Sequence, residues 1–268
     1  MSQNRHDVDD KMETFSPSRA GTRLNKRAVS VSVRDATGPT YVPLHSHRRA
    51  QLLYSSNGTL QVTADMGIWV VPADQAVWLP AQTMHEVMVR GAISPHSLFF
   101  KPSDSMQMRD TCCVVTISPL LRELILYAAK MDDQDLPGPN ERLIEVILDQ
   151  VKDLPSAPLF LPVADDPRLQ HIMDALRENP ADQRALADWG GLVGSSERTL
   201  ARLFQSQTGY TFGQWREKVR LLAAIEALGN GQSVTSLAFD LGYQSQSAFI
   251  AMFKRSLGKT PGQFFRST

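Results

Sequence analysis

The last hundred or so residues contain one pattern twice, with the two copies about 49 positions apart. Each copy has a small residue, a glycine four positions later, and then apolar residues at helical spacing. The pairs are Gly190 with Gly194 and Ala238 with Gly242. A small residue lets two helices cross closely, and glycine accepts the left-handed backbone of a tight turn. The pattern therefore predicts two helix-turn-helix units.

The second helix of each predicted unit has an apolar and a polar face. Ser196 and Ser245 are expected to cap these helices at their N-termini. The apolar faces contain Leu200, Leu203 and Phe204 in the first helix and Phe249, Met252 and Phe253 in the second. The opposite faces contain Arg198, Ala201 and Arg202 in the first, and Gln246, Ser247, Ile250 and Lys254 in the second. Such a face fits the major groove of DNA, so double-stranded DNA is the expected partner.

The charge of the chain limits how it can bind DNA. Its 28 Lys and Arg residues balance 28 Asp and Glu residues. Residues 162–268 contain 12 basic and 10 acidic residues. This balance argues against an architectural protein that binds any DNA strongly, because sequence-independent binding depends on phosphate neutralisation. Specific binding then depends on where the charges lie.

The chain of 268 residues is long enough for two domains. Residues 1–25 are polar, have no apolar segment typical of a secretory signal, and are expected to form a disordered tail. The sequence contains no run of 18 apolar residues, so no membrane-spanning helix is expected. The two cysteines, Cys112 and Cys113, are adjacent and fit a reducing compartment. We therefore expect a cytoplasmic protein without a membrane partner.

A strand-rich segment and then a helical segment precede the repeated pattern. Together with the helical C-terminal part they predict an α+β fold. Residues 26–116 contain many short alternating segments separated by Gly, Pro, Asn and Asp, and predict a β-barrel or sandwich. Residues 117–165 predict two amphipathic helices, the first capped by Ser118, followed by a proline-rich connection. The apolar stripes of these helices fit either packing on the β domain or a homodimer contact. The DNA-binding domain is then expected at residues 166–268, with a cap at Asp166 and another at Asp182.

The C-terminal sequence resembles the AraC/XylS family of transcription regulators over about residues 166–268. The matching segments are Leu200-Ala-Arg-Leu-Phe204, Gly209-Tyr-Thr-Phe-Gly-Gln-Trp-Arg216, Ala238-Phe-Asp-Leu-Gly-Tyr243, Ser247-Ala-Phe249, Phe253-Lys254 and Gly258-Lys-Thr-Pro-Gly262. The resemblance implies a seven-helix domain with two helices in successive major grooves. The positions it implies for DNA contact are Arg198, Ala201 and Arg202 in the first unit and Gln246, Ser247, Ile250 and Ala251 in the second.

One of these positions departs from the family pattern. Ala251 stands where some members have a basic residue, which makes base contacts by the second unit weaker or more dependent on DNA shape. Basic residues elsewhere in the domain are expected to contact phosphates, which position the protein without specifying sequence. They are Arg216, Lys218, Arg220, Lys254, Arg255 and Lys259.

Three histidines distinguish the β-rich half. His45 and His47 alternate on one side of a predicted strand, and His85 begins another. The layout resembles the cupin fold, a small β-barrel whose members often hold a metal with histidines and a carboxylate. Gln51 occupies the carboxylate position, so the resemblance leaves two interpretations open. His45, His47, Gln51 and His85 either bind a divalent metal or line a polar effector pocket.

These features favour a non-enzymatic, sequence-specific transcription regulator that responds to a small molecule in a cupin-like sensor domain. The alternative is a metal-dependent cupin enzyme fused to a DNA-binding module, and the neutral Gln51 counts against it. The expected partners are promoter DNA, the effector and, for an activator, RNA polymerase.

Overall fold

The computed structural model describes residues 13–14, 28–33, 36, 38–90, 93–105, 108–131 and 138–265. The tail expected at residues 1–25 thus lies outside the described residues except for Glu13 and Thr14, which form strand β1. The chain divides into two compact units. Unit 1 contains Met1–Asp65 and Trp69–Leu159, and unit 2 contains Met66–Ile68 and Phe160–Thr268. Among the described residues, no helix has the length and apolarity to cross a membrane.

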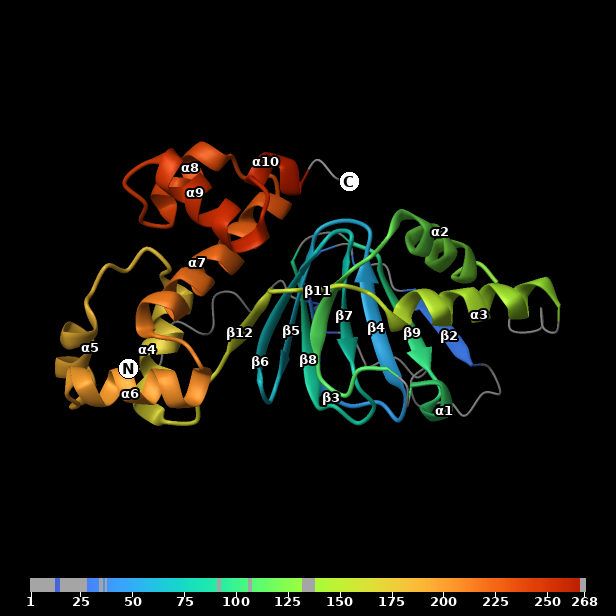
Figure 1. Cartoon of the computed structure of the whole chain (residues 1–268), viewed down its shortest axis with the longest axis horizontal. Helices are drawn as coiled ribbons and strands as arrows, with labels where there is room; N and C mark the ends of the chain where they lie inside the picture. The colour runs from blue at the N-terminus through green and yellow to red at the C-terminus, as the bar shows by residue number, and fades with distance from the viewer. Residues whose placement is uncertain are drawn as a thin grey trace. The chain divides into compact units, whose positions relative to one another are not determined.

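Unit 1 is built on two sheets (Figure 1). One sheet has the order β11-β10-β7-β4-β9-β2, and the other contains β1-β3-β8-β5-β6. Strand β1 pairs with β3 in parallel. The other pairs are antiparallel: β3 with β8, β5 with β8, β4 with β7, and β4 with β9. The strands are β1 (Glu13–Thr14), β2 (Val29–Val33), β3 (Thr40–His45), β4 (Ala50–Ser55), β5 (Thr59–Ala64), β6 (Gly67–Pro72), β7 (Gln75–Leu79), β8 (His85–Arg90), β9 (Pro95–Phe100), β10 (Cys113–Thr116) and β11 (Ser156–Ala157).

The closed form of the expected barrel is not found, because the described strands form two separate hydrogen-bonded sheets. Alternation of apolar and polar residues predicts which face of a strand is buried. It carries no information about whether the last strand pairs back to the first. A sandwich and a barrel can therefore share the same sequence pattern.

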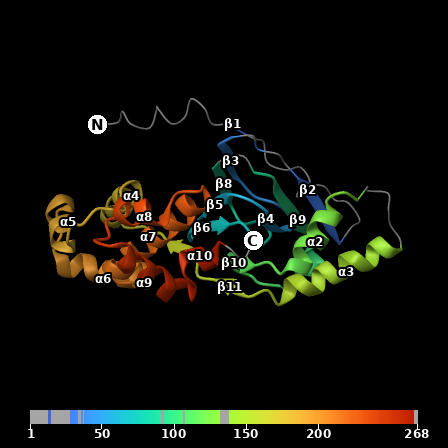
Figure 2. The same ribbon diagram turned by 90° about the horizontal axis from the view of Figure 1, so that it is seen from above.

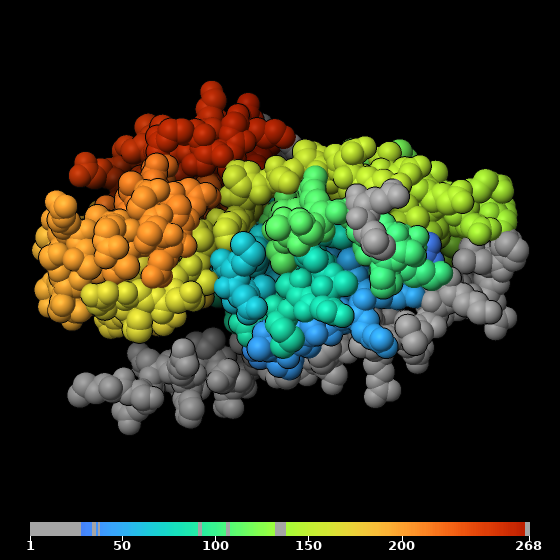
Figure 3. All heavy atoms as spheres, turned by 60° about the horizontal axis from the view of Figure 1, so that its bottom comes forward, coloured from blue at the N-terminus to red at the C-terminus, as the bar shows by residue number. Residues whose placement is uncertain are grey.

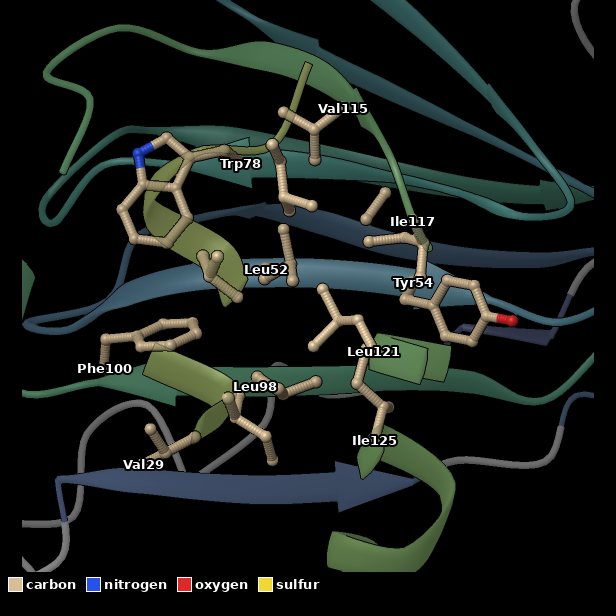
Figure 4. Packing of buried hydrophobic residues seen from close by; sticks show 14 of the residues in the cluster. Val29, Leu52, Tyr54, Trp78, Leu98, Phe100, Val115, Ile117, Leu121 and Ile125 are labelled. Atoms are coloured by element: carbon tan, nitrogen blue, oxygen red, sulfur yellow. The ribbon is translucent and has the colours of Figure 1, made fainter. Parts of the chain in front are cut away.

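Helices α2 (Pro119–Ala128) and α3 (Pro139–Lys152) belong to unit 1, in which the chain also forms the short helix α1 (Pro102–Ser105). As predicted, Ser118 caps α2 by accepting a hydrogen bond from the backbone of Leu121. Leu121 and Ile125 point toward the sheet residues Leu52 and Leu98 (Figure 4). The buried residues of α3, which are Ile144, Ile147 and Val151, join the same core.

The apolar stripe of α3 therefore covers the sheet, and the homodimer contact considered for it does not apply to that face. Both helices lie along one side of the sheet that contains β4 and β9 (Figure 2). The opposite side of α3 is at the surface (Figure 3). Val146 is exposed on α3, and Leu120 and Tyr127 are exposed on α2. The helices are thus part of the β unit rather than a separate linker.

Unit 2 is helical and begins with β12 (Phe160–Pro162), which pairs with the start of β6 within the same unit. Helix α7 runs between a group formed by α4, α5 and α6 and a group formed by α8, α9 and α10 (Figure 1). Trp215 of α7 is fully buried and donates a hydrogen bond to the carbonyl of Pro162 over 2.9 Å. The helices are α4 (Pro167–Glu178), α5 (Leu186–Val193), α6 (Glu197–Thr208), α7 (Phe212–Gly229), α8 (Val234–Asp240), α9 (Gln246–Leu257) and α10 (Pro261–Phe264).

Candidate nucleic-acid interface and histidine cluster

Helices α5 and α6 form the first helix-turn-helix unit. Gly190 lies at their crossing, where a Cβ atom would be 2.5 Å from the carbonyl oxygen of Ser195. The backbone N–H of Ser195 donates to the carbonyl of Gly190 over 2.9 Å, and this bond closes the turn. Gly194 ends α5 with φ of 65°, in the left-handed region that favours glycine. The predicted roles of both glycines are confirmed.

Helix α6 presents one polar face. Ser196 caps it by accepting a hydrogen bond from the backbone N–H of Thr199 over 3.2 Å. Arg198, Ala201 and Arg202 are exposed on the side opposite its buried residues, which are Leu200, Leu203 and Phe204. Within the described part of the chain, neither arginine has an ion-pair or hydrogen-bond partner. Both guanidinium groups are therefore available to an external acceptor.

Helices α8 and α9 form the second unit in the same way. Ala238 is fully buried at the crossing, and Gly242 turns the chain with φ of 78°. The backbone N–H of Tyr243 donates to the carbonyl of Ala238 over 2.9 Å. Ser245 caps α9 by accepting from the backbone N–H of Ala248. The repeat in the sequence is thus a repeat in the structure.

The outer face of α9 differs from that of α6. Gln246, Ser247, Ala251 and Lys254 are exposed, and Ile250 is half-buried. Gln246 accepts a hydrogen bond from the hydroxyl of a threonine on α8 over 3.3 Å, so its amide is partly oriented before any ligand binds. The two described cations of α9, Lys254 and Arg255, lie in the last turn of the helix, and Arg255 is paired with Glu217.

Two arginines expected to contact phosphates are hydrogen-bonded within the fold. Arg220 is 9% exposed, and its guanidinium donates to the carbonyls of Pro180 and Asp182 over 2.8 and 3.2 Å. Arg216 donates to the carbonyl of Arg184 over 3.0 Å, and partial burial lowers its pKa. Both therefore tie α7 to the segment before α5, where buried charge is compensated by hydrogen bonds.

The remaining predicted phosphate contacts divide into two kinds. Arg255 forms an ion pair with Glu217 over 2.6 Å, and the amine of Lys218 donates to a backbone carbonyl over 3.4 Å. Lys254 and Lys259 are exposed. Exposed lysines on or just after α9 fit phosphate contact.

In unit 1, the fold brings three of the predicted site residues together. His45 and His85 are direct partners across the β3–β8 pairing, with ring centroids 4.3 Å apart. The ring of His47 is 4.8 Å from that of His45 and 5.4 Å from that of His85. One ligand atom of each residue lies within 4.8 Å of the other two. We call these residues the histidine cluster.

The fourth predicted residue, Gln51, lies on β4 in the other sheet. Its side-chain N–H donates to the hydroxyl of Ser97 over 2.9 Å. Gln51 is paired across the sheet with Phe99, whose ring packs edge-on against His47 with centroids 5.0 Å apart. Paired residues have side chains on the same face of a sheet, so Gln51 faces the histidine side. The histidine cluster therefore lies between the two sheets.

Backbone carbonyls that the sequence analysis missed orient two of the imidazoles. Nδ1 of His45 is 2.7 Å from the carbonyl oxygen of Pro43, and Nδ1 of His85 is 2.9 Å from that of Thr83. A carbonyl only accepts, so each Nδ1 carries the proton and each Nε2 keeps its lone pair. Burial lowers the pKa of His85 to about 4, which keeps its ring neutral near pH 7. Because every residue has a backbone carbonyl two positions before it, the sequence offers no signal for these two contacts.

Two helix-turn-helix units with exposed polar recognition helices define unit 2 as a DNA-binding domain of the kind found in transcription regulators. A family model described as a helix-turn-helix domain matches residues 189–267. The chain is 37% identical over 243 residues to the HTH-type transcriptional regulator NimR of Escherichia coli, covering 90% of this chain and 89% of that protein. This chain belongs to the AraC/XylS family of helix-turn-helix transcriptional regulators.

Other similarities are more local or more distant. The HTH-type transcriptional regulator RipA of Corynebacterium glutamicum is 33% identical over 111 residues, which is 41% of this chain and 32% of RipA. Among solved structures, ToxT of Vibrio cholerae matches with 10% identity and a TM-score of 0.38, covering 89% of this chain and 98% of ToxT. A likeness as distant as the last has no bearing on function.

Proposed function

We propose that this regulator binds promoter DNA through α6 and α9 of one chain, and that α6 supplies most of the base-specific contacts. The observation that supports this assignment is the exposed pair Arg198 and Arg202, one turn apart on a capped helix. Arginine forms a bidentate pair with guanine O6 and N7. Ala201 lies between them and fits a thymine methyl, and Ser196 lies at the helix N-terminus, where a phosphate is favoured.

The second unit has a different part in this proposal. Gln246 can pair with adenine, and Ser247, Ile250 and Ala251 offer a hydroxyl and apolar contacts. Lys254 supplies a phosphate contact. Because the face lacks the arginine pair of α6, its contribution is mainly to position the protein and to sense DNA shape.

Unit 1 is the sensor in this proposal, with a cupin-like arrangement of strands in residues 26–116. Its effector site includes His45, His47, Gln51 and His85, which are polar groups on faces otherwise packed with apolar side chains. The effector must bind two arrangements of the protein with different affinity in order to shift DNA binding. The neutral Gln51 and membership in a family of regulators favour sensing over cupin catalysis.

The proposed partners and location follow from DNA binding. The regulator acts in the cytoplasm, where promoter DNA is accessible, and contacts RNA polymerase if it activates transcription. A homodimer through the exposed outer residues of α2, including Leu120 and Tyr127, is the remaining dimer hypothesis. A sedimentation experiment at micromolar concentration that finds only monomer rejects it.

The test is a binding assay with the DNA upstream of this gene and its neighbours, at a stated salt concentration. We expect at least one fragment to bind much more tightly than random DNA of equal length. Candidate metabolites and divalent metals are then added to the specific complex. Equal affinity for all fragments contradicts the proposed specificity, and affinity independent of every additive leaves the sensor assignment without support.

A further inference from the structure

The histidine cluster has the features of a preorganised metal site. Its three ligand atoms lie within 4.8 Å of one another, and a tetrahedral ion with bonds near 2 Å requires nitrogens about 3.3 Å apart. Small side-chain rotations close this difference. The ligands come from β3, from the residues just after it and from β8, so the paired strands hold them in place.

The tautomers of two histidines also fit a metal. Histidines that bind metals usually donate their second ring N–H to a carbonyl or carboxylate, which fixes the ring and directs the other nitrogen to the ion. His45 and His85 have this arrangement through the carbonyls of Pro43 and Thr83. Nε2 of His85 is buried and has no hydrogen-bond partner among the described residues. An unpaired buried acceptor is costly, and an ion would satisfy it.

The surroundings restrict which ion fits. Among the described residues the cluster contains no carboxylate or thiolate, and the nearby Gln51 is neutral. The side-chain oxygen of Gln51 is buried and also lacks a hydrogen-bond partner in this part of the chain. Three neutral imidazoles suit zinc, copper, nickel and cobalt, whereas magnesium and calcium require oxygen ligands. His45 is only half-buried, which leaves an approach for an outside ligand.

We propose that His45, His47 and His85 bind one divalent late transition-metal ion, with a coordination position left open for an exogenous ligand. The ion keeps its full charge because its protein ligands are neutral. An anion is therefore the ligand class that the open position favours. The inference rests on the proposed sensor role of unit 1, but metal binding is measured without DNA, so it can fail while DNA binding through α6 and α9 stands, and the reverse.

The experiment uses the full chain, stripped of metal by a chelator and titrated with Co²⁺. We expect one cobalt per chain by elemental analysis and visible d–d absorption typical of four- or five-coordinate cobalt. Azide added afterwards should change that spectrum, because it occupies the open position. Mg²⁺ at equal concentration should not displace the cobalt.

Variants assign the site to the cluster. His45→Ala removes a half-buried ligand, and His85→Gln keeps a polar side chain at a fully buried one. Each should weaken cobalt binding by about tenfold or more. His171→Ala, which changes an exposed histidine of unit 2, serves as the matched control and should bind cobalt as the wild type does.

Two results overturn the proposal. One is a folded chain, checked by circular dichroism, that shows no d–d absorption at one equivalent of cobalt. The other is unchanged cobalt affinity in a folded His45→Ala variant, which remains informative even if His85→Gln fails to fold. Gel-shift measurements on the same samples report DNA binding separately.

Discussion

At the scale of single residues, the arginines of unit 2 show how little a charged residue reveals in isolation. Arg202 is exposed on α6, whereas Arg220 on α7 is buried and holds two backbone carbonyls. Both were expected to contact DNA. The sequence specifies the side chain, but only the fold decides whether water or a carbonyl surrounds it. The charges available for DNA contact are therefore fewer than the composition suggests.

We expect Arg202→Ala to weaken binding to the specific promoter site by about 1–3 kcal/mol, because a bidentate base contact is lost. Binding to random DNA should change much less. Fluorescence anisotropy with both DNAs measures the difference. Arg177→Ala is the control, since it removes an arginine from the surface of α4. An equal loss on both DNAs would show that Arg202 contacts a phosphate.

Asp166 predicts a pH effect on the stability of unit 2. It caps α4 by accepting from the backbone of Arg168, whose guanidinium also bonds it over 2.7 Å and lowers the pKa of Asp166 to about 2. The ionised carboxylate stabilises the fold above its unfolded pKa near 4, and this contribution disappears as the pH falls from 4 toward 2.

Asp166→Ala should therefore lower the free energy of unfolding by about 1 kcal/mol at pH 7. Asp166→Asn retains a capping side chain and should lose less. Denaturant titrations at pH 7 and pH 3 measure both effects. A deficit of the alanine variant that stays the same at both pH values would rule out the charge of Asp166 as its source.

At the scale of elements, the crossing of α5 and α6 depends on the absence of a side chain at Gly190. Gly190→Ala should destabilise unit 2 by about 1–3 kcal/mol, because its Cβ would overlap the carbonyl oxygen of Ser195. The neighbouring Gly191→Ala meets nothing within 4 Å and should stabilise α5 by up to about 1 kcal/mol. Thermal unfolding followed by circular dichroism compares the two.

The pair of substitutions is informative because both change the same residue type in the same helix. If Gly190→Ala unfolds at the same temperature as the wild type, the helices can separate without cost and the crossing is not tight. Gly190→Ala should lower DNA affinity together with stability, whereas Gly191→Ala should leave DNA affinity unchanged, since its Cβ meets nothing within 4 Å.

Element types were largely predictable from the sequence, but their surroundings were not. Ser118 and Asp166 cap helices as expected, because a cap depends on a few adjacent residues. The cap expected at Asp182 is wrong, since α5 begins only at Leu186 and Asp182 pairs with Arg184 instead. Local patterns of this kind place a helix more reliably than they place its first residue.

The histidine cluster marks a similar limit. Alternation along one strand was expected to place His45 and His47 on the same side; strand β3 ends at His45, and His47 follows it, but the two rings do lie together, with centroids 4.8 Å apart. The pairing of His45 with His85 depends on the register between β3 and β8, which no local pattern supplies. The sequence therefore indicated the residues of the cluster without giving its geometry.

At the scale of the whole molecule, α7 sets the spacing of the two recognition helices. Its 18 residues correspond to a rod about 27 Å long, and the helix-turn-helix units flank it within one compact unit (Figure 1). This length suits two helices that enter successive major grooves on one side of the duplex.

Methylation-interference footprinting should therefore find two groups of contacts about 10 base pairs apart on one face of the DNA. Arg202→Ala should weaken the group next to α6 and leave the other in place. A single continuous group, or two groups on opposite faces, would contradict this arrangement. Sites with a 5-base-pair insertion between the groups serve as the control and should bind poorly.

The difference between the faces of α6 and α9 has a consequence for the genome. A two-fold symmetric dimer of identical helices recognises palindromes, which have no direction. One chain with two unlike helices recognises a sequence that has a beginning and an end. If α6 and α9 of one chain bind bases as proposed, its operators have polarity, and turning one around in place would keep every base pair while presenting it to α6 and α9 in the opposite direction along the promoter.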